Sequence, residues 1–285
     1  MAFLDELREK AEGIILKVGL GLGDTAIHNV KILKATSEIL KFNQSSFLFF
    51  GKRNDLRDLA VNPLYNENSM VLVDSDDPAS EVLHYLKNNK ISCVIRGSIS
   101  SNPFLRNLNV ILHISKINRL ALLETNFGYQ FFFGPVGIDE CYDLESKKQF
   151  IESALIELRN LNIKPKISVL SGGRLGDVGR NLTVDKSLEE AKKLVDYFNL
   201  KEPGLEIDHN EILIEKAIKN ESNLILAPNG IAGNLIYRTL VHLGGGKAYG
   251  AIYMGTGYNI IDTSRVGDFS EIFGGIILAL ALSKR

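Results

Sequence analysis

The sequence predicts an α/β protein in which helices cover a largely parallel β-sheet. Its 285 residues are 45% hydrophobic and 24% charged, with a formal net charge of -1, which is the usual balance for a globular chain with a substantial core. Short runs rich in Val, Ile and Phe alternate along the chain with stretches whose apolar residues recur every three or four positions. The runs indicate buried strands and the stretches indicate amphipathic helices, and their alternation is typical of α/β proteins.

Helices and strands are expected to alternate in the first part of the chain. Phe3, Leu7 and Ala11 recur at helical spacing, and the β-branched run Ile14–Val18 is typical of a strand that ends at glycines. The other helices are expected at Ala26–Leu40 and near Ser80–Asn88. The other strands are expected at Ser46–Phe50, Met70–Asp74, Cys93–Arg96 and Val110–Ile114.

The middle of the chain predicts an antiparallel hairpin, after which the alternation returns. Asn126-Phe127-Gly128 is typical of a turn between the strands Ala121–Glu124 and Tyr129–Phe133. Ser187 and Glu190 have the spacing of a capping pair, which predicts a helix from Ser187 to Phe198. The remaining elements are expected to be the strands Ile167–Leu170, Asn223–Ala227 and Ala251–Met254 and the helices Asp143–Leu161, Asn234–Leu243 and Glu271–Ser283.

Charge and cysteine usage limit the classes of function. The 33 basic and 34 acidic side chains leave no excess of positive charge for a nucleic acid or an anionic membrane. Cys93 and Cys141 stand alone and the five histidines lack metal-ligand spacing, so we expect no metal site and a reducing compartment. The N-terminus is acidic, unlike a signal peptide, and the longest apolar run, Ile272–Leu282, is shorter than the roughly 20 residues that span a bilayer. We therefore expect a cytoplasmic protein that acts on small molecules.

A glycine-rich turn, Gly19–Asp24, follows the first expected strand and would suit a phosphate held by backbone N–H groups. It differs from the dinucleotide-binding motif because Asp24 stands where the third glycine is required. It is more similar to the turn of adenosylmethionine-dependent methyltransferases, which have an acidic residue after the second strand, where this chain has Lys52 and Arg53. A tight turn from strand to helix is the simpler interpretation of the glycines.

Two later segments hold residue types that bind anions. Ser171–Asn181 contains four glycines, two arginines and a leading serine, which favours either an anion-binding loop or a flexible surface connection. Asn234 ends the segment Pro228–Asn234, where it suits a helix cap as well as a ligand-binding amide. Neither segment decides between its two interpretations.

Near the C-terminus, Ser264 and Arg265 precede a pair of acidic residues, Asp268 and Glu271. The three-residue spacing of the acidic pair is typical of the start of a helix. Taken alone, the segment is explained by a helix cap and a surface cation.

Together, the later segments resemble the phosphate acetyltransferase and butyryltransferase family. Leu226–Tyr237 is similar to the family's P-D-L-N-A-G-N-I-x-Y-K helix start, and Leu240–Gly250 is similar to its R-L-G-G-A-x-A-x-G-P-I segment. Ile261–Arg265 falls where the family has N-D-L-S-R-G, but Ala251 and Val266 replace its proline and its glycine. The chain most resembles the divergent methanogen branch, which carries the methyltransferase-related label Mtx subunit X.

The resemblance implies two α/β/α domains of the isocitrate-dehydrogenase and phosphotransacetylase type, with the active site in a cleft between them. The first domain would comprise residues 1–137 and 264–285, because the chain returns to it at the C-terminus. The second domain would comprise residues 138–263. The final helix, Glu271–Ser283, should then pack on the first domain. Members of the family are commonly homodimers, so a homodimer is expected here.

The resemblance also implies acyl transfer between a coenzyme A thioester and inorganic phosphate, with no permanently bound cofactor. Arg265 would bind phosphate and the charge that develops on the carbonyl oxygen, and Ser264 would hydrogen-bond the sulfur or that oxygen. Glu271, at the family's aspartate position, would accept the thiol proton. The implied substrate-binding residues are Ser171, Gly172, Gly173 and Asn234. Two alternatives stay open, a methyltransferase-related subunit and a non-catalytic accessory or binding subunit, since a shared fold does not fix a reaction.

Overall fold

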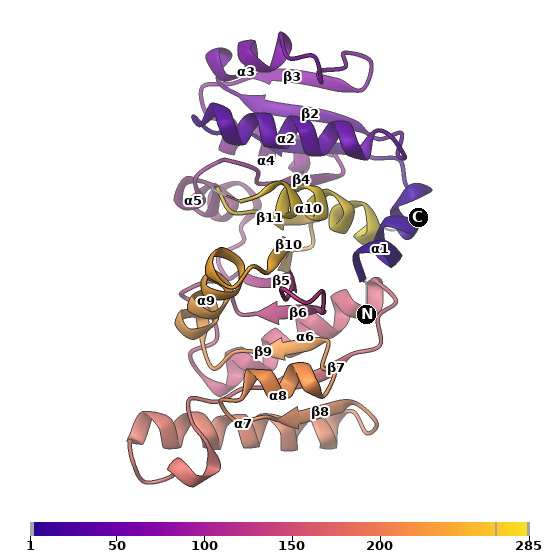
Figure 1. Cartoon of the computed structure of the whole chain (residues 1–285). Helices are drawn as coiled ribbons and strands as arrows, with labels where there is room; N and C mark the ends of the chain where they lie inside the picture. Colours follow the sequence, from indigo (N-terminus) through magenta and orange to yellow (C-terminus); the bar gives the residue numbers. More distant parts are fainter. Residues whose placement is uncertain (1–2, 266, 284–285) are drawn as a thin grey trace. The chain divides into compact units, whose positions relative to one another are not determined.

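A computed structural model describes residues 3–265 and 267–283 and divides the chain into two compact units (Figure 1). The central unit is Asn118–Lys247, and the terminal unit joins Phe3–Ile117 to the chain from Ala248 onward. The predicted boundaries, 137 and 263, differ from these because the hairpin strands belong to the central sheet and the strands before residue 263 belong to the terminal sheet. The two ends of the predicted first domain, residues 1 and 285, and Val266 of the predicted motif lie outside the described residues.

The terminal unit contains a mainly parallel sheet with the order β3-β2-β1-β4-β11-β10. Its first five strands in that order are parallel, and β10 is antiparallel to β11. The strands are β1 (Lys17–Gly21), β2 (Ser46–Gly51), β3 (Met70–Asp74), β4 (Cys93–Ile95), β10 (Lys247–Met254) and β11 (Ile260–Asp262).

Helices cover both faces of this sheet (Figure 1). Two of them, α4 and α5, pack on each other, and the other face carries α10 against α1 and α2. The helices of the terminal unit are α1 (Phe3–Glu12), α2 (Ala26–Ile39), α3 (Arg53–Ala60), α4 (Pro78–Lys87), α5 (Ser101–Leu112) and α10 (Phe269–Leu282). The prediction that the last helix packs on the first domain is confirmed, because α1 and α2 belong to that domain.

The central unit has the strand order β5-β6-β9-β7-β8. The expected hairpin is present, with β5 antiparallel to β6, and the other pairs are parallel. Its strands are β5 (Asn118–Glu124), β6 (Gln130–Gly134), β7 (Lys166–Val169), β8 (Glu206–His209) and β9 (Leu224–Leu226). Its helices are α6 (Leu144–Asn160), α7 (Leu182–Lys201), α8 (Ile214–Lys219) and α9 (Gly230–Arg238), with a 3₁₀ turn (Leu175–Asp177) before α7 and a π-helical segment (Thr239–Leu243) after α9.

Glycine packing shifts the first strand from its predicted place. β1 begins at Lys17, not at Ile14, and runs through Gly19 and Gly21. A Cβ on Gly21 would stand 2.5 Å from the carbonyl oxygen of Arg96, and one on Gly23 would stand 2.4 Å from that of Ser98. The glycines of this turn therefore let the ends of β1 and β4 approach each other, which supports the structural interpretation of the turn.

Three other predicted elements are wrong in type or in start. Val110–Ile114 is not a strand; Phe104, Leu108 and Ile111 bury one face of α5, at spacings of four and three residues. The helix expected from Ser187 begins at Leu182, because Asn181 caps it by accepting the N–H of Thr183 at 2.8 Å. Similarly, the helix expected from Asn234 begins at Gly230 and is capped by Asn229.

Both cysteines are buried, which makes their reactivity a test of the fold. Burial raises the pKa of the Cys93 thiol to about 12, and Cys141 is also buried. Since the thiolate is the reactive form, we expect neither thiol to react with iodoacetamide at about pH 8 until the protein unfolds. Mass spectrometry of the labelled protein with and without denaturant measures this, and rapid native labelling of Cys93 would contradict the described packing.

The described helices also bear on membrane insertion. Over residues 3–265 and 267–283, no helix is both long enough and apolar enough to cross a bilayer.

Candidate active site

The topology of the terminal unit singles out the carboxyl ends of β1 and β4. These strands are neighbours in the sheet, but the chain leaves β1 toward β2 and leaves β4 on the other side. In open α/β sheets, the loops diverge at such a point and leave a crevice that binds ligands. The loop after β11 begins at the same end of the sheet, because β11 is parallel to β4.

A pocket of about 440 Å³ lies at this edge. Ser264 and Arg265, which follow β11, line it together with the first residues of α5. One guanidinium nitrogen of Arg265 donates to the hydroxyl of Ser100 at 3.1 Å. The structure thus brings two of the predicted catalytic residues to one pocket. The full lining is Arg96, Ser100, Ser101, Asn102, Pro103, Ser264 and Arg265.

The start of α5 makes this pocket suitable for an anion. The first-turn amides of Ser101 and Asn102 have no acceptor within the helix, and Pro103 has no N–H. The side chain of Ser100 makes no capping bond. A helix N-terminus carries a partial positive charge, to which the exposed guanidinium of Arg265 adds a full one. Phosphate would meet amides, hydroxyls and a cation here.

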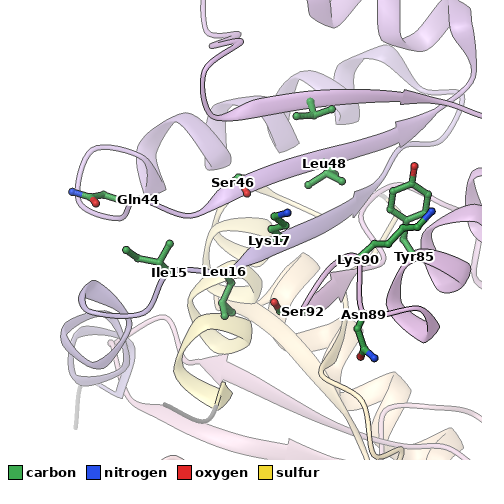
Figure 2. Close-up of a pocket in the computed structure, with 11 residues that line it drawn as sticks. Ile15, Leu16, Lys17, Gln44, Ser46, Leu48, Tyr85, Asn89, Lys90 and Ser92 are labelled. Atoms are coloured by element: carbon green, nitrogen blue, oxygen red, sulfur yellow. The ribbon is translucent and has the colours of Figure 1, made fainter.

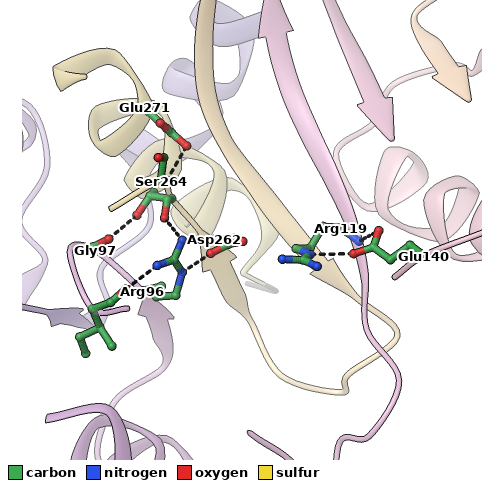
Figure 3. A network of polar contacts seen from close by, with 9 residues as sticks. Arg96, Gly97, Arg119, Glu140, Asp262, Ser264 and Glu271 are labelled. Atoms are coloured by element: carbon green, nitrogen blue, oxygen red, sulfur yellow. Dashed lines mark hydrogen bonds and ion pairs between the residues drawn. The ribbon is translucent and has the colours of Figure 1, made fainter. Parts of the chain in front are cut away.

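A buried arginine joins the segments that form the pocket (Figure 3). Arg96, which is 5% exposed, pairs through Nε with Asp262 and donates through its two terminal nitrogens to the carbonyl oxygens of Ile99 and Thr263. Burial opposes the charge on Arg96, but Asp262, Tyr253 and Glu271 together outweigh it and the pKa of Arg96 is raised. The guanidinium therefore stays protonated.

Glu271 lies behind Ser264 and not among the lining residues (Figure 3). The residue is 6% exposed, and its carboxylate accepts the backbone N–H of Ser264 at 2.7 Å. Asp268 is the N-cap of α10 and Glu271 its third residue, as the spacing predicts, but Asp268 makes no side-chain cap and accepts a hydrogen bond from Lys31 instead. The carboxylate of Glu271 holds the loop that carries Arg265, and its acid–base role stays a prediction.

A histidine near this loop adds no charge at neutral pH. Burial lowers the pKa of His28, and the nearby cations Lys31 and Arg265 lower it further. Because His28 is neutral, it adds no positive charge to that of Arg265, the exposed cation of the pocket lining.

The predicted substrate-binding residues lie in the central unit. Ser171 is fully buried, and its hydroxyl donates to the carbonyl oxygen of Gly173 at 2.9 Å. The N–H of Gly172 donates to the hydroxyl of Ser187, which lies inside α7. Asn234, inside α9, donates to the carbonyl oxygen of Val136 at 2.8 Å. Each residue is thus placed within its unit, and convergence of Ser171 and Asn234 with Ser264 and Arg265 on one pocket stays a prediction.

His209 gives the loop after β7 a pH-dependent contact. Its Nε2 lies 2.9 Å from the hydroxyl of Ser171, and burial lowers its pKa. The folded state therefore binds this proton less readily than the unfolded state, so the contribution of His209 to stability should fall as the pH drops below the ordinary histidine value of about 6.5. Titration of the imidazole signals by NMR checks the direction, with His209→Gln identifying the resonance. A pKa at or above the ordinary value would contradict it.

A larger cavity, of about 780 Å³, lies at the opposite edge of the terminal sheet (Figure 2). Lys17, Ser46 and Ser92 stand in one row at the amino ends of three strands, and Tyr85 and Lys90 approach from the end of α4. None of the predicted site residues lines this cavity. Amino ends of parallel strands are also not the usual place for a ligand in such sheets. We therefore assign the candidate site to the smaller pocket.

Sequence reasoning missed five of the seven residues that line the pocket. Their signal was a short buried strand followed by Arg-Gly-Ser, then two serines and Asn-Pro before an apolar helical pattern. The wrong strand at Val110–Ile114 concealed the helix, and with it the helix start. The missed lining residues are Arg96, Ser100, Ser101, Asn102 and Pro103, and Asp262, the partner of Arg96, was missed with them. Within the described part of the chain, no three His, Cys, Asp or Glu side chains are grouped to hold a metal ion.

Comparison with known proteins gives relatives of two kinds. "Putative methyltransferase mtx subunit X" of Methanosarcina mazei is 35% identical over 282 residues, covering 99% of this chain and 95% of that protein. A phosphate acetyltransferase of Acetivibrio thermocellus is 22% identical over 330 residues, covering 96% of each. No family model matches the chain.

A solved structure supports the fold class. A phosphotransacetylase from Streptococcus pyogenes superposes with a TM-score of 0.73 at 17% identity, covering 98% of this chain and 97% of that one. Similarity of this extent confirms the predicted α/β fold of the phosphotransacetylase type.

Proposed function

We propose that this chain, which belongs to the family of proteins named "Putative methyltransferase mtx subunit X", transfers an acyl group between a coenzyme A thioester and inorganic phosphate. The observation that carries the proposal is the pocket at the start of α5, where Ser264 and Arg265 stand beside unbonded helix amides. The phosphotransacetylase-type fold and the distant phosphate acetyltransferase relative support it.

The pocket residues suit this reaction. Arg265 and the amides of Ser101 and Asn102 would hold phosphate while one of its oxygens attacks the thioester carbonyl carbon. The hydroxyl of Ser264 would donate to the oxygen that becomes negative as the carbon turns tetrahedral. The carbon–sulfur bond then breaks and the sulfur takes up a proton from the protonated form of Glu271, which gives an acyl phosphate and free coenzyme A. In the reverse direction, Glu271 would accept the thiol proton.

The central unit would supply the rest of the substrate site. Ser171, Gly172, Gly173 and Asn234 are proposed to contact the coenzyme A thioester, which acts as a substrate and not as a bound cofactor. The N–H groups of Gly172 and Arg174 are bonded to Ser187 and Asp177, so this contact would exchange those bonds for bonds to the phosphates of the coenzyme. A cytoplasmic homodimer that acts on small molecules fits this proposal.

A second candidate function follows from the name of the relatives, a methyltransferase-related or accessory subunit. The turn expected to bind adenosylmethionine is Gly19–Asp24. The space beside Gly21 and Gly23 is filled by the loop after β4, which Cβ atoms on these glycines would meet. Arg53, after the second strand, donates to Asp74 at 2.8 Å where a ribose-binding carboxylate would be needed. These contacts favour the acyl-transfer proposal over methyl transfer at this turn.

The purified protein decides between these functions. With acetyl coenzyme A and phosphate, we expect release of free thiol that depends on phosphate, and we expect each substrate to raise the melting temperature by mass action. Adenosylmethionine should leave the melting temperature unchanged. Stabilisation by adenosylmethionine alone would favour the methyltransferase-related role. Binding of acetyl coenzyme A and phosphate without turnover would favour an accessory subunit.

A further inference from the structure

Arg96 has no part in the reaction proposed above, yet it is a charged side chain buried at the end of β4. Its three nitrogens each have an acceptor, which are Asp262 and the carbonyl oxygens of Ile99 and Thr263. Such a charge is costly to bury unless its hydrogen bonds are satisfied. The end of a short strand does not need a buried charge for its own structure. The bonds of Arg96 therefore serve another purpose.

The acceptors of Arg96 are the residues that come directly before the pocket. Ile99 precedes Ser100, the residue before α5, and Thr263 precedes Ser264. The guanidinium therefore fixes the last peptide group before each of the two segments that line the pocket. A second bond joins the same loops, because the hydroxyl of Thr263 donates to the carbonyl oxygen of Gly97 at 3.1 Å.

The loop that carries Arg96 has little room to move toward β1. Gly97 has a φ of +64°, and a Cβ there would stand 2.0 Å from the carbonyl oxygen of Gly21. The hydroxyl of Ser98 accepts the N–H of Gly23 at 2.7 Å and donates to Asn29 at 2.6 Å. The loop after β4 is thus anchored on β1 and α2, and Arg96 extends this anchor to the loop after β11.

We propose that Arg96 is a positioning residue, which holds the Ser264–Arg265 loop at the start of α5 so that both segments face one bound phosphate. The inference rests on the proposed function. Asp262 balances the charge of Arg96. Arg96 therefore contributes by fixing the geometry of the pocket more than by attracting the phosphate. Only a planar guanidinium presents three separate nitrogens to three acceptors, whereas lysine has one nitrogen.

The test uses Arg96→Lys and Arg96→Met in the full chain, with inorganic phosphate as the ligand. Isothermal titration gives the phosphate dissociation constant, and hydrogen exchange without ligand follows the amide of Ser264, which is bonded to Glu271. The matched control is Arg119→Lys in the central unit, where Arg119 pairs with the buried Glu140 at 2.6 Å (Figure 3).

We expect Arg96→Lys to weaken phosphate binding by about tenfold or more, because the charge remains but two of the bonds are lost. The Ser264 amide should exchange faster in this variant, while amides of β1 and β2 keep their protection. Arg96→Met should weaken binding at least as much. Arg119→Lys should leave phosphate affinity and the exchange of Ser264 unchanged.

Two outcomes would overturn the inference. Wild-type phosphate affinity and wild-type Ser264 exchange in Arg96→Lys would show that a charge suffices. Loss of protection throughout the terminal unit would show that Arg96 stabilises the fold in general. The proposed function fails separately, if the wild-type protein neither binds phosphate nor turns over. Hydrogen exchange without ligand then still tests the positioning role.

Discussion

Replacing Arg265 by methionine is expected to lower phosphate-dependent acyl transfer by about 100- to 1000-fold, the range seen when a preorganised donor to a developing charge is removed. Arg265 is exposed and bonds Ser100 at 3.1 Å, so its loss removes a ligand-binding cation without leaving a buried group unpaired. The melting temperature without ligand should therefore change little. Steady-state rates at saturating acetyl coenzyme A, with phosphate varied, measure the effect.

The matched control for Arg265 is Arg53→Met. Arg53 is another exposed arginine of the terminal unit, and it bonds Asp74 after β3 and not a residue of the pocket. Its replacement should leave the rate and the Michaelis constant for phosphate unchanged. Full activity in Arg265→Met would remove this residue from the site, while an equal loss in both variants would indicate a general charge effect.

Local patterns predicted most of the sheet, because its strands are short buried runs between turn residues. β3 lies where it was expected, at Met70–Asp74, and the hairpin of β5 and β6 follows from the turn at Asn126–Gly128. The errors arose where a neighbour far along the chain decides the local structure. Gly19 and Gly21 continue β1 instead of ending it, since adjacent strands and loops fill the space that side chains would need.

In the candidate site, too, residues within a local motif were predicted and residues that depend on distant neighbours were not. Ser264 and Arg265 were predicted through a motif, and both line the pocket. Arg96 was not predicted, because an arginine after a strand is usually a surface residue. Its partner Asp262 stands 166 positions away, and only the pairing of β4 with β11 brings the two together. Residues that position a site in this way carry no signal within their own segment.

Replacing Glu271 by glutamine should lower acyl transfer by about 100-fold or more, as expected when a general base is lost. The glutamine carbonyl can still accept the N–H of Ser264, which the carboxylate accepts at 2.7 Å, so the loop and the melting temperature should be largely kept. Glu271→Ala should lower both the rate and the melting temperature, because it also leaves that partly buried N–H without its acceptor. Comparing the two variants separates proton transfer from loop support.

The control for Glu271 is Asp268→Asn, three residues earlier on the same helix start. Asp268 is exposed and bonds Lys31, so its replacement should leave turnover intact and change stability little. Unaltered turnover in Glu271→Gln, with a loss in Glu271→Ala, would assign Glu271 to loop support alone. The proton would then have to pass to solvent or to phosphate itself, because the side chains that line the pocket are hydroxyls, an amide, a proline and guanidinium groups. A pH–rate profile of Glu271→Gln in the direction that forms the acyl coenzyme A distinguishes these cases, since loss of the base removes the acidic limb of the profile while loop support leaves it in place.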